Sequence, residues 1–211
     1  MKVDLHGVFS GRRVLVTGHT GFKGSWLSLW LSELGAEVTG FALAPEYSSS
    51  HFEVLELDRR VKHVEGDLRD AGSFQAAFDK AQPEVVFHLA AQALVRRSYD
   101  DPKATIDTNV TGSVNVLEAV RASNDVKSLV FVTSDKCYLN KEWVWGYREN
   151  DELGGHDPYS ASKAAAEARA EATAAMLHGA ARTARCTSAA ARARTRFSTP
   201  SCRPGHRRAT R

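Results

Sequence analysis

The chain has 211 residues, a formal net charge of +3, 43% hydrophobic residues and 25% charged residues. This composition suits a globular domain with a hydrophobic core and excludes collagen-like, disulfide-rich and wholly disordered proteins. Its three cysteines (Cys137, Cys186 and Cys202) include no close pair, so neither a disulfide framework nor a zinc-ligand spacing is expected. No apolar run approaches the roughly 18 residues that a membrane span needs, and MKVDLHGVF has no signal-peptide core. We therefore expect a cytoplasmic protein without a membrane partner.

Residues 11–167 alternate short apolar runs with helical patterns. The run Arg13–Thr17 is typical of a buried strand, and the apolar stretch up to Leu34 predicts a helix that Gly35 ends. Continuous apolar strands separated by helices are typical of a parallel sheet covered on both faces. We predict a doubly wound, Rossmann-like α/β domain over residues 11–167 and an N-terminal extension over 1–10. Further strands are expected at 36–43, 61–64, 84–89 and 128–133, and further helices at 70–81 and 105–122.

Three glycines follow the first strand with the spacing GxxGxxG. Gly18, Gly21 and Gly24 stand where a tight turn enters the first helix, and glycine there lets the backbone approach a pyrophosphate. The helix N-terminus would offer unpaired N–H groups to the phosphates. A plain turn remains the alternative, but the position between strand and helix favours dinucleotide binding.

Two further positions bear on the identity of the dinucleotide. Asp67 follows the third strand and could accept a hydrogen bond from the adenine amine, although an Asp there is also typical of a turn or a helix cap. The second strand ends in FALAP without an acidic residue, and Glu46 comes slightly late to hold the ribose. No Arg stands there either, which favours NAD over NADP.

Tyr159 and Lys163 form a YxxxK pattern. On a helix these side chains lie on one face, so the ammonium could lower the phenol pKa and reach the nicotinamide ribose. A phenol tuned in this way can remove a hydroxyl proton as hydride leaves the same carbon. The fifth strand ends in Thr133–Lys136, and open α/β sheets place their chemistry at such carboxyl ends.

Together these segments resemble the extended short-chain dehydrogenases/reductases, and among them the CDP-glucose 4,6-dehydratases of the NAD-dependent epimerase/dehydratase family. The resemblance covers most of residues 11–167, and Ser134-Asp135-Lys136 stands where the related dTDP-glucose enzymes have Thr-Asp-Glu. The segments that carry it are VTGHTGFKGSWLSLWL (16–31), HLAAQALVRRSY (88–99), TNVTGSVNVLEAV (108–120), TSDKCYLNKEWVWGYREND (133–151) and LGGHDPYSASKAAAE (153–167).

The resemblance implies dehydration of CDP-glucose to a 4-keto-6-deoxy sugar nucleotide, as used for deoxysugars of surface polysaccharides. Tyr159, assisted by Lys163, would take the proton of the 4-hydroxyl while NAD accepts hydride from C4. Lys136 would act as or assist the base at C5, Asp135 would protonate the departing C6 hydroxyl, and Ser134 would hydrogen-bond the oxygen on C4. Hydride returns to C6, so no net redox change occurs.

The resemblance also implies cofactor contacts and a possible homodimer. Asn109 is expected to order the loop beside the cofactor rather than react. The NAD contacts implied are Gly18, Gly21, Phe22, Gly24, Asp67, Leu68, Leu89, Ala90, Ala91, Asn109, Tyr159 and Lys163.

Several of these side chains have simpler interpretations. Without the resemblance, Lys136 reads as a surface lysine, Asp135 as a helix or turn cap, and Ser134 as a hydroxyl bonded to the backbone. Arg96 and Arg97 could meet a pyrophosphate or stay solvated. Trp143 and Trp145 are more typical of core or lid packing than of base stacking.

The last segment, 168–211, has a different composition. It holds 10 Arg, one Glu and no Lys, Val, Ile, Trp or Tyr, a net charge of +9, whereas residues 1–167 hold 18 Lys and Arg against 24 Asp and Glu, a net charge of −6. Such a segment buries too little apolar surface to order itself, and the abrupt change indicates a reading-frame shift. An Arg-rich arm for nucleic acid is the weaker alternative, because Phe197 is its only aromatic residue. Ala164–Ala175 could still be helical.

Two function classes follow. The first is an NAD-dependent nucleotide-sugar dehydratase. The second is an inactive remnant that lacks the family's C-terminal substrate domain and at most binds NAD. A related nucleotide-sugar dehydratase or epimerase is a further alternative.

Overall fold

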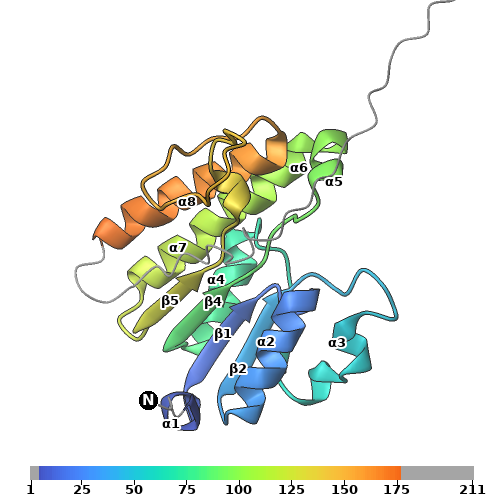
Figure 1. Ribbon diagram of the computed structural model, residues 1–211. Coiled ribbons are helices and arrows are strands. Elements are labelled where there is room, and N and C mark those ends of the chain that lie inside the picture. Colours follow the sequence, from blue (N-terminus) through green and yellow to red (C-terminus); the bar gives the residue numbers. More distant parts are fainter. Residues whose placement is uncertain (1–4, 177–211) are drawn as a thin grey trace, which may run out of the picture.

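A computed structural model describes residues 5–176 of the chain (Figure 1). Its centre is a five-stranded, all-parallel sheet in the order β3-β2-β1-β4-β5. The order reverses direction next to β1, and in open α/β sheets ligands bind at such a reversal, outside the carboxyl ends of the strands. The strands are β1 (Arg13–Thr17), β2 (Glu37–Ala42), β3 (Lys62–Glu65), β4 (Val85–His88) and β5 (Ser128–Phe131).

Helices lie on both faces of the sheet, as Figure 1 shows. The longer ones are α2 (Phe22–Glu33), α4 (Ala71–Ala81), α7 (Gly112–Ala122) and α8 (Pro158–Met176). The short ones are α1 (Leu5–Phe9), α3 (His51–Val54), α5 (Val95–Asp100), α6 (Pro102–Ile106), the 3₁₀ turns η1 (Leu57–Arg59) and η3 (Asp135–Cys137), and the π-helical turn η2 (Asp107–Thr111).

Alternating side chains of the strands build two separate cores. Leu15 of β1 packs with α4, α7 and α8, whereas Val14 and Val16 pack on the opposite face with α2, α3 and η1. All three are at most 1% exposed. Because successive side chains of a strand point to opposite faces, one apolar run supplies both cores. The doubly wound α/β fold predicted from the sequence is confirmed.

The prediction of one continuous helix over 105–122 is wrong in detail. The helical segment begins earlier, at Pro102, after the Asp101 carboxylate caps α6 through the backbone N–H of Ala104 at 2.9 Å. The π-helical turn η2 then interrupts the helix before α7. A π turn adds one residue to a helical turn and is frequent at functional sites. Here it leaves Asn109 1% exposed and directed into the molecule.

Other boundaries agree closely with expectation. The helix that starts at Pro158 runs on to Met176, as its alanine content allows. The short helices α3 and η1 between β2 and β3 were not predicted. No helix within residues 5–176 has the length and apolar character to cross a bilayer. The interpretations of residues 177–211 concern a segment outside the described residues.

Candidate functional site

The glycine loop joins β1 to α2 at the carboxyl edge of the sheet. Gly18 has φ +75°, and a Cβ there would lie 2.7 Å from the backbone of Ala90. A Cβ on Gly24 would lie 2.1 Å from the carbonyl oxygen of Gly18, so any side chain would separate α2 from the loop. Gly21 is the N-cap of α2 and has no side chain to occupy the exposed N–H groups. The loop is therefore a bare backbone cradle at a helix N-terminus, which fits a pyrophosphate.

A buried polar chain supports this cradle from below. The Thr17 hydroxyl lies 2.7 Å from His88 Nδ1 and accepts hydrogen bonds from the N–H groups of Leu89 and Ala90. His88 Nε2 lies 3.0 Å from the hydroxyl of Ser113. These bonds fix the start of the loop after β4 against the glycine loop. This row of hydrogen bonds is not predicted from the sequence, because a lone His in an apolar strand gives no indication of its partners.

Burial lowers the pKa of His88 to about 3, and the neighbouring Lys163 adds to this effect. Because the folded-state pKa lies below the ordinary value of 6.5, the neutral ring contributes stability above that value and loses it as the pH falls.

We expect the free energy of unfolding to fall by about 1 kcal/mol per pH unit between pH 6 and 4 on account of His88. Urea unfolding of wild type and His88→Gln across this range measures it. The variant should show a shallower dependence, with a remainder from His19, whose pKa burial lowers to about 4. Parallel slopes for the two proteins would contradict the assignment.

His19, the residue after Gly18, is turned inward. Its ring is fully buried and packs over Gly40, where a Cβ would lie 2.2 Å from the ring. Its Nε2 lies 2.7 Å from His63 Nδ1, and its edge meets Phe52. His19 therefore anchors the glycine loop to β2 and β3, which sequence reasoning also missed.

The two positions considered for the adenosine end are engaged within the protein. The Asp67 carboxylate receives several hydrogen bonds from the side chain of Arg69 and one from its backbone N–H, and these bonds lower the pKa of Asp67. This is the turn geometry weighed from the sequence, and it leaves adenine binding by Asp67 a prediction. Glu46 pairs with Arg97 of α5 at 3.3 Å. Arg97 is thus paired, and Arg96 is exposed.

The other expected cofactor contacts surround the same edge of the sheet. Leu68 is buried against Gly112, and Phe22 at the start of α2 is 70% exposed. Ala90 lies against Gly18, while Ala91 follows it in the partly buried loop after β4.

The residues predicted to carry acid–base chemistry meet where β5 ends and α8 begins. Tyr159 and Lys163 are each 8% exposed and lie one helical turn apart on the inner face of α8. The Ser134 side chain and the negative charge of Asp135 both influence the pKa of the Tyr159 phenol, so these groups lie close together. The Ser134 hydroxyl also donates to Asp135 at 3.1 Å and accepts from the backbone N–H of Lys136 at 3.2 Å. The structure therefore brings Ser134, Asp135, Tyr159 and Lys163 together.

The expected electrostatics of this group need a correction. Burial raises the pKa of Tyr159, the Ser134 hydrogen bond opposes this, and the negative charges of Asp135 and Asp157 add to it. Burial also lowers the pKa of Lys163 to about 8. In the protein by itself the ammonium does not bring the phenol toward neutrality, because desolvation disfavours both charged forms.

Asn109 joins the two halves of the site. Its side chain accepts a hydrogen bond from the N–H of Gln92 at 2.8 Å and donates to the Gln92 carbonyl and to the hydroxyl of Ser162. It thereby holds the loop after β4 against α8, in line with the loop-ordering role expected for it.

Lys136 and the tryptophans lie in the segment between β5 and α8, where they are exposed or partly exposed. Lys136 is exposed, and its charge lowers the pKa of Asp157. Trp143 packs against Trp145 and Tyr147 with ring centroids 5.4 and 5.6 Å away, and Trp145 is 61% exposed. This matches packing in a loop rather than core burial.

Asp157 precedes α8 and caps its first turn. Its carboxylate accepts from the backbone N–H of Ser160 at 2.9 Å and from the Ser160 hydroxyl at 2.6 Å, immediately before Pro158. Desolvation raises the pKa of Asp157, but the hydrogen bonds from Ser160 lower it, and the pKa stays below its ordinary value.

Replacing Asp157 by Ala is expected to lower the free energy of unfolding by about 1 kcal/mol, the usual effect of removing a helix cap. Chemical denaturation of Asp157→Ala and of the exposed-site control Asp58→Ala compares the two. Equal stabilities would show that the cap is dispensable.

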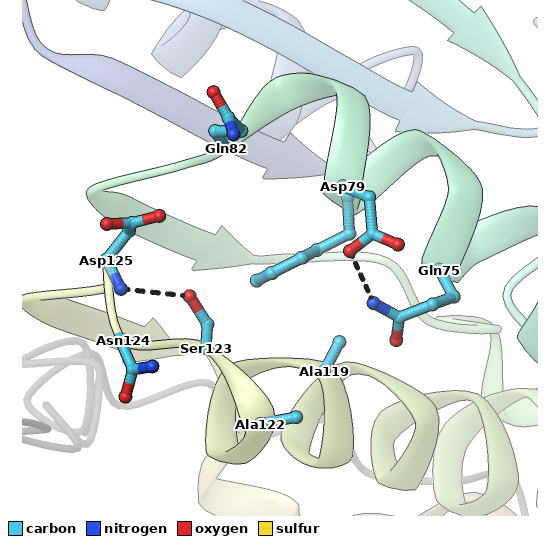
Figure 2. Close-up of a pocket in the computed structure, with 9 residues that line it drawn as sticks. Gln75, Asp79, Gln82, Ala119, Ala122, Ser123, Asn124 and Asp125 are labelled. Carbon is cyan, nitrogen blue, oxygen red and sulfur yellow. Dashed lines mark hydrogen bonds between the residues drawn. The ribbon is translucent and has the colours of Figure 1, made fainter.

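A cavity of about 460 Å³ elsewhere is not part of this site. Figure 2 shows that it lies between the ends of α4 and α7, with Asp79 held by Gln75 and the Asp125 N–H directed to Ser123. Both helices end there before entering β4 and β5, so the cavity lies at the amino edge of the sheet, opposite the glycine loop. Among residues 5–176, no cluster of His, Cys, Asp and Glu is arranged to hold a metal ion.

Known proteins resemble the chain in sequence and in fold. The sequence profile described as GDP-mannose 4,6 dehydratase matches residues 15–202. The chain belongs to this dehydratase family. The chain is 53% identical over 164 residues to a CDP-glucose 4,6-dehydratase of Salmonella typhimurium, and the match covers 78% of this chain and 46% of that protein. The family resemblance inferred from the sequence is confirmed.

Solved structures share the fold of this dehydratase-family chain. A UDP-glucose 4-epimerase from Thermotoga maritima, solved with UDP-glucose, has a TM-score of 0.68, 31% identity, and coverage of 77% of this chain and 51% of that one. The UDP-glucose 4-epimerase of Thermus thermophilus, solved with NAD, has a TM-score of 0.66 at the same identity and coverage. The chain thus spans about half the length of the relatives it matches.

Proposed function

We propose that the chain carries the NAD site and the acid–base residues of a nucleotide-sugar 4,6-dehydratase that acts on CDP-glucose. The single observation that carries this proposal is the grouping of Ser134 and Asp135 with Tyr159, with Lys163 one helical turn further along α8 and close enough to Lys23 of α2 for the two charges to interact. The 53% identity to a CDP-glucose 4,6-dehydratase supports the choice of substrate over those of the epimerase relatives.

The cradle suits NAD, because Gly18 and Gly24 let backbone segments approach so closely that a Cβ would clash, and Gly21 leaves the N-terminus of α2 without a capping side chain. Bound NAD would supply the hydride acceptor and donor that an internal hydride transfer in the sugar needs. Gly18, Gly21 and the N-terminus of α2 would hold the pyrophosphate, and Lys163 would reach the nicotinamide ribose. The glycine loop and the loop containing Ala90 and Ala91 border the space for the cofactor.

Tyr159 would accept the proton of the sugar 4-hydroxyl. Burial raises the pKa of this phenol in the protein by itself, so the proposed role requires a positive charge near the phenol when the cofactor is bound, which would lower the pKa. Lys136 would act as, or assist, the base that removes the C5 proton. Asp135 would protonate the C6 hydroxyl as it leaves, and Ser134 would hydrogen-bond the oxygen on C4. The rim position of Lys136 and Asp135 and the inner position of Tyr159 suit a sugar that enters from solvent.

Residues are proposed here for binding NAD and for the acid–base chemistry on the sugar, but none is proposed for binding the cytidine end of the substrate. This favours a second candidate, a protein that binds NAD without turning over CDP-glucose. The homodimer and the cytoplasmic location remain proposals from the family resemblance.

Incubation of the protein with NAD⁺ and either CDP-glucose, UDP-glucose or GDP-glucose, followed by mass spectrometry, tests the proposal. We expect a product lighter by one water from CDP-glucose above all. An isomer of unchanged mass would indicate an epimerase. NAD⁺ binding in calorimetry without any product would favour the second candidate.

A further inference from the structure

A third ionisable side chain continues the row formed by Tyr159 and Lys163 on α8. Glu167 follows Lys163 by four residues, as Lys163 follows Tyr159, and side chains at this spacing lie one above the other on a helix. The exposed fractions are 8% for Tyr159, 8% for Lys163 and 3% for Glu167. The proposed function gives no role to Glu167.

A carboxylate buried to this extent is costly unless a charge or hydrogen bonds compensate it. The neighbouring inner positions of α8, Ala166 and Ala170, belong to the hydrophobic core. The ammonium of Lys163 is the cation one turn away on the same face of the helix. Burial lowers the pKa of Lys163, and the charge of Glu167 acts in the opposite direction.

We propose that Glu167 is a positioning residue that keeps the buried ammonium of Lys163 charged on the face of α8 that it shares with Tyr159. This inference rests on the proposed function for the importance of Lys163, but the effect of Glu167 on Lys163 is a property of the folded chain. Without the carboxylate, Lys163 would lose its proton more readily, and a smaller fraction of the molecules would carry a positive charge beside the phenol near neutral pH.

Other groups act on Lys163 from the elements packed around it. Cys137 of η3 favours the ammonium, and Lys23 of α2 disfavours it. His88 of β4 is held neutral by burial, which lowers its pKa to about 3. Glu167 is the carboxylate among these groups. Its removal should therefore lower the pKa of Lys163 in a way that the other groups do not compensate.

The test is a pH titration of Lys163 by NMR in protein labelled with ¹³C at the lysine ε carbon, with the signal assigned by its loss in Lys163→Met. In Glu167→Gln we expect the pKa of Lys163 to fall by about one from its wild-type value. In Glu167→Asp, which keeps the negative charge, the pKa of Lys163 should fall less. This variant provides the measurement if Glu167→Gln folds poorly. The matched control is Glu171→Gln, the same change one turn further along α8, and it should leave the titration unchanged.

A Lys163 titration that is the same in wild type, Glu167→Gln and Glu171→Gln would overturn the inference, and so would equal shifts in both Gln variants. The measurement uses neither NAD nor a sugar nucleotide. Failure of the proposed dehydratase function would appear as missing product in the incubation above, whereas failure of this inference would appear only in the lysine titration.

Discussion

Replacing Tyr159 by Phe is expected to reduce formation of the 4-keto product from CDP-glucose by about 10³-fold, in the range of a lost general base. In the proposed function the phenol takes the 4-hydroxyl proton, and Phe keeps the ring that packs at the start of α8. NAD⁺ affinity should stay within about threefold, because the pyrophosphate cradle lies on the β1–α2 loop and does not include this hydroxyl. Product formation and calorimetric NAD⁺ binding measure the two effects separately.

The matched control is Tyr47→Phe, which removes the same hydroxyl from a side chain that is 67% exposed. It should turn over like wild type. Full activity in Tyr159→Phe would remove Tyr159 from the mechanism. An equal loss in both variants would point to a general defect instead.

Gly24→Ala is expected to reduce both stability and cofactor binding. The added Cβ would lie 2.1 Å from the Gly18 carbonyl oxygen, which is backbone and cannot swing aside. Either α2 moves away from the glycine loop or the loop distorts, and overpacking of this kind costs about 3 kcal/mol. Since the phosphates would bind to that same junction, we expect NAD⁺ affinity to fall by about tenfold or more.

Gly72→Ala is the matched control, because it makes the same substitution near the start of α4. A Cβ there would meet only the Asp70 side chain, at 3.5 Å. Alanine is the better helix former, so stability should change by about 1 kcal/mol or less. Denaturation curves and NAD⁺ titrations of the two variants give the comparison. Normal NAD⁺ affinity in folded Gly24→Ala would place the pyrophosphate elsewhere.

The fold was predictable because its signals are local. Each strand of a doubly wound sheet is a short apolar run, and the strand predicted at Arg13–Thr17 has the same bounds as β1. The glycine loop was recognisable for the same reason, since Gly18, Gly21 and Gly24 lie between a strand and a helix. The spacing of Tyr159 and Lys163 likewise placed both on one helical face.

The parts that were missed depend on contacts between distant segments. The hydrogen bond between Thr17 and His88 joins residues 71 positions apart, and that between His19 and His63 joins residues 44 apart. The π-helical turn around Asn109 was also missed, because its sequence DTNVT has the apolar spacing of an ordinary helix. The raised pKa of Tyr159 could not be foreseen either, since it depends on how deeply the phenol is buried.

The most direct test of the proposed mechanism uses CDP-glucose that carries deuterium at C4, incubated with the protein and NAD⁺. Because hydride would leave C4 and return to C6 within one active site, we predict a 4-keto-6-deoxy product with the deuterium on C6. Deuterium that remains on C4 of an isomerised sugar, deuterium lost to solvent, or the absence of any dehydrated product would contradict the account.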